Sequence, residues 1–238
     1  MLRFSNIVVL TGAGISAESG IPTYRGADGL WAGHRVQDVA TADAIATNPW
    51  AVTDFFNAQR QDLKGKQPNA AHYALATLAR TPGLSCHIIT QNIDPLHEQA
   101  GSPHVHHLHG ELLKRTCTEC GFTGPIQGDM DIDDLCPACT TQGTLRPDIV
   151  LFGEVPKEFD QAIRAIATCD LFVSIGTSGV VYPAADLVRY ARQAHAYTIC
   201  LNLNPEAEAT ALFDRFIIGP ATMTVPQLVG EVMDAIYR

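Results

Sequence analysis

The sequence predicts an α/β fold, in which a parallel sheet with helices on both faces carries a small zinc-binding and helical lobe. Short apolar segments alternate with helical patterns along much of the chain, an order typical of a parallel sheet covered on both faces. The first apolar segment runs directly into a glycine-rich turn, which makes the predicted sheet Rossmann-like. Two Cys-x-x-Cys pairs in a polar stretch predict the zinc-binding part. With 238 residues, 46% of them hydrophobic, the chain can form one domain with a small insertion.

The first predicted element is a strand over residues 7–10, because an unbroken apolar run rich in β-branched residues is expected of a strand buried on both faces. Gly12 and Gly14 follow at once, and Ala17 comes three positions later. This spacing is typical of the turn that brings backbone amides close to a pyrophosphate. We therefore expect Gly12, Ala13 and Gly14 to contact a dinucleotide.

The segment after this turn does not continue as it does in a dehydrogenase. Gly20, Pro22 and Gly26 end the helix early, and no apolar strand with an acidic ribose ligand follows about 20 residues on. Residues 26–48 are predicted to form a loop over the ligand, since a long loop without structure of its own is usually functional. A hydride-transferring dehydrogenase is thus disfavoured, and the absence of any absorbance change with NADH would exclude it.

The remaining elements complete two predicted lobes. Helices are expected over 49–64, 70–80, 97–100, 157–169, 183–195 and 226–237, the second of them capped by Asn69. Strands are expected over 85–90, 105–108, 146–152, 171–175, 198–202 and 216–218. The large Rossmann-like lobe is expected to comprise residues 1–25, 81–112 and 146–238, and the small lobe the insertions 26–80 (helical) and 113–145 (the zinc module).

Composition narrows the function classes. The net charge of −9 and the lack of a Lys/Arg cluster argue against direct nucleic-acid binding. No apolar run approaches the ~18 residues of a membrane helix, and no signal-like segment precedes the first strand, so no membrane partner is expected. Paired cysteines without a disulfide framework are typical of a reducing compartment. We therefore expect a cytoplasmic protein.

The cysteine pairs carry the most specific single signal. Cys117 and Cys120 are separated by fifteen residues from Cys136 and Cys139. This spacing is typical of a tetrahedral four-thiolate zinc site, which has no open position and is therefore structural. The alternative, four free thiols, would leave a polar insertion with almost no core.

Polar residues stand at the carboxyl ends of several predicted strands. The alternative to a binding role at any one of them is simple turn capping. Because ligands bind at this edge of open α/β sheets, four such strand ends predict one crevice in which amides and a carboxylate contact a carboxamide or a ribose. The residues are Gln91, Asn92, Asp94, Gly176, Thr177, Ser178, Asn202 and Asn204.

His109 is the predicted general base, because histidine has a pKa near the working pH and this one precedes a strand-end glycine. A histidine packed in the core or on the surface is the alternative. Three histidines within four residues also suggest a metal site, but neighbours on a strand point to opposite faces. We interpret His106 and His107 as structural.

Taken together, these residues closely resemble the sirtuins, the NAD-dependent protein deacylases. The matching blocks occur in the family's order and span nearly the whole chain, which resembles a bare catalytic core of bacterial type. They are Gly12–Ser16, Gly20–Pro22, Tyr24–Arg25, Thr90–Asp94, Leu108–Gly110, the cysteine pairs, Arg146–Pro147, Val150–Glu154, Gly176–Ser178 and Asn202–Asn204.

The resemblance implies a mechanism in which NAD is a consumed cosubstrate. Asp94 and the backbone of Ile93 would hold the nicotinamide carboxamide, and Asn92 would order the ribose and a water. The acyl-lysine oxygen would attack the ribose carbon as nicotinamide leaves, giving an imidate-like intermediate. His109 would then deprotonate a ribose hydroxyl, which attacks that intermediate to give free lysine and O-acyl-ADP-ribose.

The resemblance also implies the remaining contacts. A loop from Gly20 to Trp31 would close over NAD. Further NAD contacts would come from Glu18, Thr23, Tyr24, Arg25, Trp31 and, at the adenine end, Ala221. An acyl-lysine peptide would bind as an added strand, contacting Val150, Phe152, Gly153, Glu154, Gly179, Val180 and Tyr182.

Three positions depart from the family pattern. Thr23 stands where many members have aspartate, and Pro95 follows Asp94 where a small or polar residue is usual. Members that remove succinyl or malonyl groups carry Tyr-x-x-Arg near the acyl pocket, where this chain has Phe56 and Gln59. Losing that charge-assisted contact should weaken acidic acyl groups by a few kcal/mol. We therefore expect neutral short acyl groups such as acetyl to be favoured. Arg60 is adjacent, but the next residue on a helix points about 100° away.

Two further functions share the nucleotide site. A non-catalytic NAD or ADP-ribose-binding module would bind but release no nicotinamide, and His109 and Asn92 argue against it. A protein mono-ADP-ribosyltransferase would transfer ADP-ribose rather than the acyl group, and the sequence leaves such a side activity open.

Overall fold

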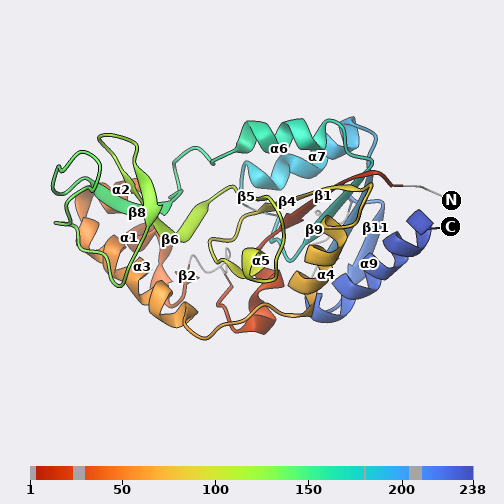
Figure 1. Ribbon diagram of the computed structural model, residues 1–238, viewed down its shortest axis with the longest axis horizontal. Coiled ribbons are helices and arrows are strands. Elements are labelled where there is room, and N and C mark those ends of the chain that lie inside the picture. The colour runs from red at the N-terminus through yellow and green to blue at the C-terminus, as the bar shows by residue number, and fades with distance from the viewer. Residues whose placement is uncertain (1–3, 24–29, 180, 204–210, 238) are drawn as a thin grey trace.

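The computed structural model describes residues 4–23, 30–179, 181–203 and 211–237. Figure 1 shows a large lobe built on a sheet, and beside it a small lobe of strands and helices. In these described parts, no helix combines the length and the apolar character needed to span a bilayer.

The large lobe contains a six-stranded sheet in the order β11-β10-β9-β1-β4-β5, and every pair of neighbours in it is parallel. This confirms the parallel sheet predicted from the sequence. Its strands are β1 (Asn6–Thr11), β4 (Ser85–Thr90), β5 (Val105–His107), β9 (Leu171–Ile175), β10 (Tyr197–Asn202) and β11 (Arg215–Ile218).

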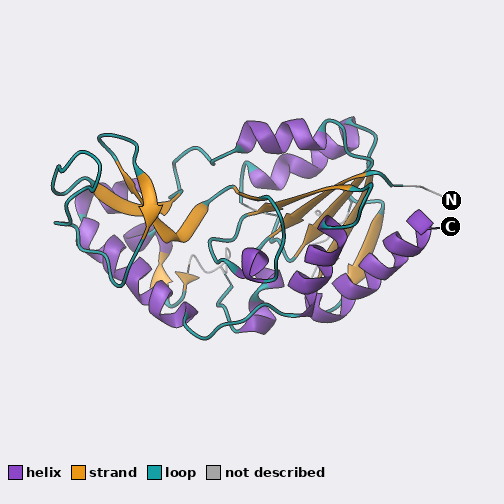
Figure 2. Cartoon of the chain, in the orientation of Figure 1, coloured by secondary structure: helices purple, strands orange, loops and turns teal. Residues whose placement is uncertain are grey.

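Alternating side chains of the central strand enter two different cores, because successive residues of a strand point to opposite faces. Ile7 and Val9 pack in the core that includes α4 (Ala70–Ala79) and α9 (Ala221–Tyr237), whereas Val8 and Leu10 pack in the core of α6 (Phe159–Ile166) and α7 (Leu187–Gln193). Figure 2 shows the sheet between these two helical layers. A strand covered on both sides explains why its sequence is apolar without alternation.

The small lobe is built around a three-stranded antiparallel sheet in the order β7-β6-β8. Its strands are β6 (Gly110–Cys117), β7 (Thr123–Pro125) and β8 (Leu145–Ile149). The strand predicted over 146–152 is therefore real in its first half, but it pairs with β6 instead of the parallel sheet. We had divided residues 110–117 between the two lobes at residue 112 and placed most of residues 145–149 in the large lobe. In the structure these two strands pair with each other in the small lobe.

Short helices occupy much of the segment that we predicted to be a loop over residues 26–48. They are α1 (Val36–Val39) and α2 (Ala42–Thr47), preceded by the strand pair β2 (Leu30–Trp31) and β3 (His34–Arg35). Val36, Val39 and Ala44 enter a core with α3 (Pro49–Leu63). The prediction was wrong here because one-turn helices carry too few residues for a periodic pattern, and tertiary packing stabilises them.

Helix capping confirms one predicted boundary and moves another. The Asn69 side chain accepts a hydrogen bond from the Ala71 amide at 3.0 Å, as predicted for α4. The helix predicted to begin at Pro226 instead begins at Ala221 and continues through that proline. Its first turn is held by the Glu18 carboxylate, which accepts from the Thr222 amide at 3.0 Å and from the Thr222 hydroxyl at 2.7 Å. The predicted helix over 97–100 is α5 (Leu96–Gln99).

Candidate active site

A cavity of about 680 Å³ lies where the carboxyl ends of β1, β4, β9 and β10 face the small lobe. This is the edge at which open parallel sheets bind ligands, and the volume is typical of a ligand site. The cavity brings together most of the site residues predicted from the sequence: Gly12, Ala13, Gly14, Thr23, Trp31, Gln59, Gln91, Asn92, Ile93, Asp94, His109, Val150, Phe152, Gly153, Glu154, Gly176, Thr177, Ser178, Tyr182 and Asn202.

Some predicted residues lie elsewhere. Of the described ones, Glu18 caps α9, Phe56 is fully buried in the small-lobe core, Ala221 is buried against the sheet, and Gly179 is not part of the wall. Tyr24, Arg25, Val180 and Asn204 lie outside the described residues.

Sequence reasoning missed several residues of the wall. Asp62 and Leu63 follow Gln59 at helical spacing on α3, so the position of Gln59 was a signal that could have found them. Apolar wall residues such as Leu112 and Ile149 look like ordinary core residues in the sequence. Pro156 had no signal in the sequence. The other members lie in or beside segments already named from the sequence, which assigned them no contact of their own: Ala17, Ile21, Pro22, Leu151, Val181 and Leu203.

The glycine turn after β1 packs directly on the loop after β9. The Gly12 amide donates to the Ile175 carbonyl at 3.0 Å, and the Gly14 amide donates to the Gly176 carbonyl at 2.9 Å. A Cβ on Gly14 would lie 2.6 Å from the Cα of Gly176. We expected these amides to approach a pyrophosphate, but the Gly12 and Gly14 amides both donate their hydrogen bonds to carbonyls at the end of β9 and in the loop after it. Glycine is required here because two backbones touch.

His109 presents one unprotonated nitrogen in its neutral form. Its Nδ1 lies 3.0 Å from the Gln91 carbonyl oxygen. Because a carbonyl only accepts, Nδ1 carries the proton and Nε2 has the lone pair. Burial lowers the pKa of His109 from its usual value, which favours the neutral ring. The residue can therefore act as a general base on the cavity wall.

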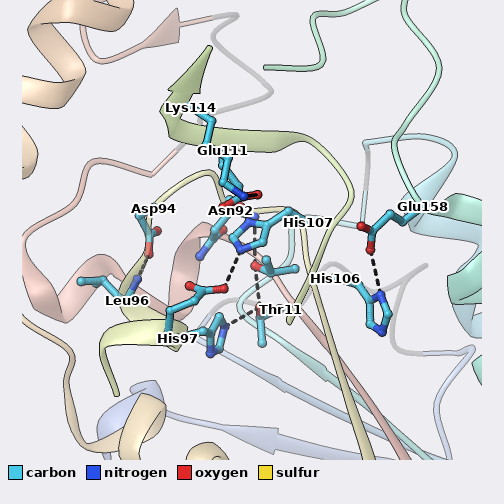
Figure 3. Close-up of polar contacts among 12 residues, drawn as sticks. Thr11, Asn92, Asp94, Leu96, His97, His106, His107, Glu111, Lys114 and Glu158 are labelled. Carbon is cyan, nitrogen blue, oxygen red and sulfur yellow. Dashed lines mark hydrogen bonds and ion pairs between the residues drawn. The ribbon is translucent and has the colours of Figure 1, made fainter. Parts of the chain in front are cut away.

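A buried hydrogen-bond network joins the ends of β1 and β4. The Ser16 hydroxyl donates to Asp94 Oδ2 at 3.0 Å and accepts from Asn92 Nδ2 at 3.2 Å. Asp94 Oδ1 accepts from the Leu96 amide at 3.1 Å, a bond that Figure 3 shows. Burial raises the pKa of Asp94, although the Leu96 amide and the Ser16 hydroxyl oppose that shift. The network fixes the side chains of Asn92 and Asp94 at the cavity. Sequence reasoning did not assign Ser16 a role.

A loop after β8 forms the opposite side of the cavity. Glu154 accepts from Arg146 Nη2 at 3.1 Å and from the Leu151 amide at 2.8 Å, so its carboxylate holds this loop in shape. Phe152 and Tyr182 are 40% and 65% exposed at the cavity. These exposed aromatic side chains offer a surface to a bound chain.

The four predicted metal ligands meet at one point in the small lobe. Their sulfur atoms all lie within 4.8 Å of one another, with 3.8 Å between Cys117 and Cys139 and 3.7 Å between Cys120 and Cys136. Tetrahedral zinc with Zn–S bonds of about 2.3 Å requires sulfur separations of about 3.8 Å. The donor set and its spacing therefore fit a structural zinc ion.

Comparison with known proteins identifies the family that shares this arrangement. The sequence profile described as "Sir2 family" matches residues 12–183, well over half of the chain. This chain belongs to the Sir2 family. The resemblance to the sirtuins inferred from the sequence is confirmed.

Two bacterial relatives of this Sir2-family chain are named NAD-dependent protein deacylase. The protein of Pasteurella multocida (strain Pm70) is 48% identical over 235 residues, which are 98% of this chain and 100% of the relative. The protein of Vibrio cholerae serotype O1 is 47% identical over 239 residues, which are 100% of this chain and 97% of the relative.

Solved structures of the family confirm the predicted fold class. A Sir2 homolog–NAD complex is 39% identical with a TM-score of 0.86, and the match covers 98% of this chain and 91% of that one. A Sir2 protein bound to a myristoylated histone peptide is 36% identical with a TM-score of 0.75, covering 98% and 92%. This chain is thus an NAD-dependent enzyme whose cysteine cluster fits a structural zinc ion.

We expect Gly14→Ala to destabilise the protein by about 1–3 kcal/mol and to impair NAD binding, because the new methyl group meets backbone atoms that cannot move aside. Denaturant unfolding and titration with NAD measure the two effects. Gly230→Ala is the matched control, since nothing lies within 4 Å of its Cβ position in α9. Equal stability of the two variants would contradict this account of the turn.

We expect one zinc ion per chain, and its removal by a strong chelator should unfold residues 113–145 because little apolar core holds them. Metal analysis with amide hydrogen exchange tests this. Cys136→Ser should lose zinc and protection there, whereas Cys86→Ser, a free thiol outside the cluster, should lose neither. Unchanged protection in zinc-free protein would contradict the prediction.

Proposed function

We propose that this cavity binds NAD together with an acyl-lysine peptide and transfers the acyl group from lysine to ADP-ribose, releasing nicotinamide. The chain is an NAD-dependent protein deacylase of the Sir2 family. The observation that best supports the residue roles is the presence of His109, with a free ring nitrogen, on the same wall as Asn92 and Asp94. The described cysteines form no disulfide, and four of them are grouped as metal ligands, which is typical of a reducing compartment and favours a cytoplasmic location.

The NAD end of the cavity lies at the carboxyl edge of the sheet. Asp94 and the Ile93 backbone hold the nicotinamide carboxamide, and Asn92 orders the ribose and a water. Support comes from the hydrogen bonds that fix both side chains through Ser16, so their polar groups are oriented before the cosubstrate arrives.

His109 acts as the base in the second half of the reaction. Its Nε2 takes the proton from a ribose hydroxyl, and that oxygen then attacks the acyl-bearing carbon. The Gln91 carbonyl keeps the ring in the required tautomer, and burial keeps it neutral.

The acyl-lysine peptide lies extended between residues 150–154 and 179–182. The loop at 150–154 is supported from behind, because the Phe152 amide donates to the Ala40 carbonyl at 2.9 Å and the Phe152 carbonyl accepts from the Ala42 amide at 3.0 Å. A supported edge with exposed Phe152 and Tyr182 suits strand addition by a peptide.

The acyl preference is for neutral groups over succinyl or malonyl. Gln59 lines the cavity without charge, and Phe56 is fully buried without a hydroxyl. Arg60 is 6% exposed and is not among the described wall residues; its Nη1 lies 3.4 Å from the Leu112 carbonyl oxygen, and its Nη2 is hydrogen-bonded to Asn57. Among the described wall residues there is no Lys or Arg, whereas Asp62 adds a carboxylate. An acidic acyl group would therefore lack a cationic partner.

With NAD present, we expect acetyl-lysine peptide to be turned over about tenfold or more faster than succinyl-lysine peptide. Mass spectrometry of the products should detect nicotinamide, free lysine peptide and O-acyl-ADP-ribose. His109→Ala should lower the rate by about 10²–10⁴-fold. Faster desuccinylation would contradict the acyl preference, and ADP-ribosylated peptide in place of the deacylated one would indicate the transferase alternative.

We expect an acid limb in the pH profile of deacylation, centred below the ordinary histidine value of 6.5. His109 works in its neutral form, so activity is present above its lowered pKa and is lost as pH falls through that value. Measuring kcat/KM for the acetyl peptide across about pH 5–8 tests this. A limb centred above 6.5 would contradict the tautomer and burial argument.

A further inference from the structure

His107 lies between two hydrogen-bond acceptors at the end of β5. The side chain is 7% exposed. Its Nδ1 lies 3.0 Å from the Asn92 carbonyl oxygen, and its Nε2 lies 2.8 Å from Glu98 Oε1 on α5. Figure 3 shows His107 beside Asn92, whereas His106 is directed the other way, toward Glu158.

These contacts require two protons on the ring. A carbonyl oxygen only accepts, and so does an ionised carboxylate, so each ring nitrogen must donate. The Glu98 side chain is 42% exposed, and water therefore solvates its charged form. His107 is thus an imidazolium paired with Glu98, unlike the neutral ring of His109.

The two histidines hold the same short backbone segment. His109 donates to the Gln91 carbonyl, and His107 donates to the next carbonyl, that of Asn92. The Asn92 amide in turn donates to Thr90 Oγ1 at 3.0 Å. The backbone at Asn92 is therefore fixed on both sides, with its side chain directed to Ser16 at the cavity.

We propose that His107 is a positioning residue for the reaction: a charged clamp between Glu98 and the Asn92 carbonyl that holds the segment from Gln91 to Asp94 in its working geometry. The inference rests on the proposed roles of Asn92 and Asp94. It keeps the structural interpretation of His107 made from the sequence and gives this residue a function that His106 does not share.

The electrostatic surroundings of His107 favour its charged form. Burial alone disfavours it, but the hydrogen bond and charge of Glu98, together with the Asn92 carbonyl, outweigh this and raise the pKa of His107. Glu111 adds a smaller attraction and is itself paired with Lys114 at 2.6 Å. His97 also faces this group, and its own pKa is lowered well below the ordinary value by burial, so it stays neutral. The positive charge also favours the ionised form of Asp94.

The first experiment is Glu98→Gln, which keeps an oxygen acceptor for Nε2 but removes the charge. Loss of an adjacent opposite charge lowers a histidine pKa by on the order of one unit. We expect the alkaline limb of kcat/KM for NAD, measured by nicotinamide release, to move to lower pH by about that amount. His106→Asn is the matched control, because it disrupts another histidine–glutamate pair on the same strand, and its profile should superimpose on that of the unmodified protein.

A second pair of variants separates the two contacts of the ring. Asn places its amide nitrogen near the position of Nδ1, and Gln places one near Nε2. His107→Asn can therefore keep the bond to the Asn92 carbonyl, whereas His107→Gln keeps only the bond to Glu98. We expect the Gln variant to lose about tenfold or more in kcat/KM for NAD relative to the Asn variant, with thermal unfolding confirming that both are folded.

One decisive outcome does not depend on any variant folding. Nitrogen NMR of the unmodified protein should show both ring nitrogens of His107 protonated at neutral pH, and one bare nitrogen would overturn the inference. An unshifted profile for Glu98→Gln, or equal losses in the Asn and Gln variants, would also overturn it. If the unmodified protein released no nicotinamide with an acyl peptide, the proposed function would fail instead.

Discussion

The site depends on a place where two backbones touch. The turn after β1 and the loop after β9 meet at Gly12, Gly14 and Gly176, and two amide–carbonyl bonds join them. This contact fixes the relative position of neighbouring strand ends, and with them the polar residues that follow each strand. Because the strands are parallel, their carboxyl ends all lie at one edge of the sheet, and residues far apart in sequence meet there. Side chains at these positions would force the loops apart.

Backbone carbonyls fix the proton on Nδ1 of both histidines, and the second partner of each ring determines its charge. One carbonyl faces each of His109 and His107, and in each case it requires a proton on Nδ1. What distinguishes the rings is the second partner: His107 has Glu98, and His109 has only the cavity. Two residues apart on one segment, the first is charged and holds structure, and the second is neutral and free to accept a proton. The alternation of side chains along a strand cannot predict this difference in charge between His107 and His109, because residues two positions apart point to the same face.

The sequence predicts those features that depend on local pattern. Short apolar segments identified β1, β4 and β9, the cysteine spacing identified the four sulfur ligands, and Asn69 marked a helix start. Features that depend on distant partners were missed. Contacts between distant segments determine three of these features: which sheet β8 joins, the capping of α9 by Glu18, and the hydrogen bonds of the Gly12 and Gly14 amides. Sequence periodicity does not reveal these contacts, because the two partners of each contact lie many residues apart.

The electrostatics of the cavity follow from where its carboxylates find their partners. Arg146 pairs with Glu154 from behind the loop, and Asp94 receives Ser16 and the Leu96 amide, with His107 beyond them. In both cases the compensating groups lie outside the described wall, which itself presents neutral and acidic atoms. We expect such a wall to disfavour a carboxylate on the acyl group, because that charge would lose water without gaining a cationic partner. The proposed preference for neutral acyl groups would then follow from the whole arrangement, and a single substitution at Gln59 would alter only part of it.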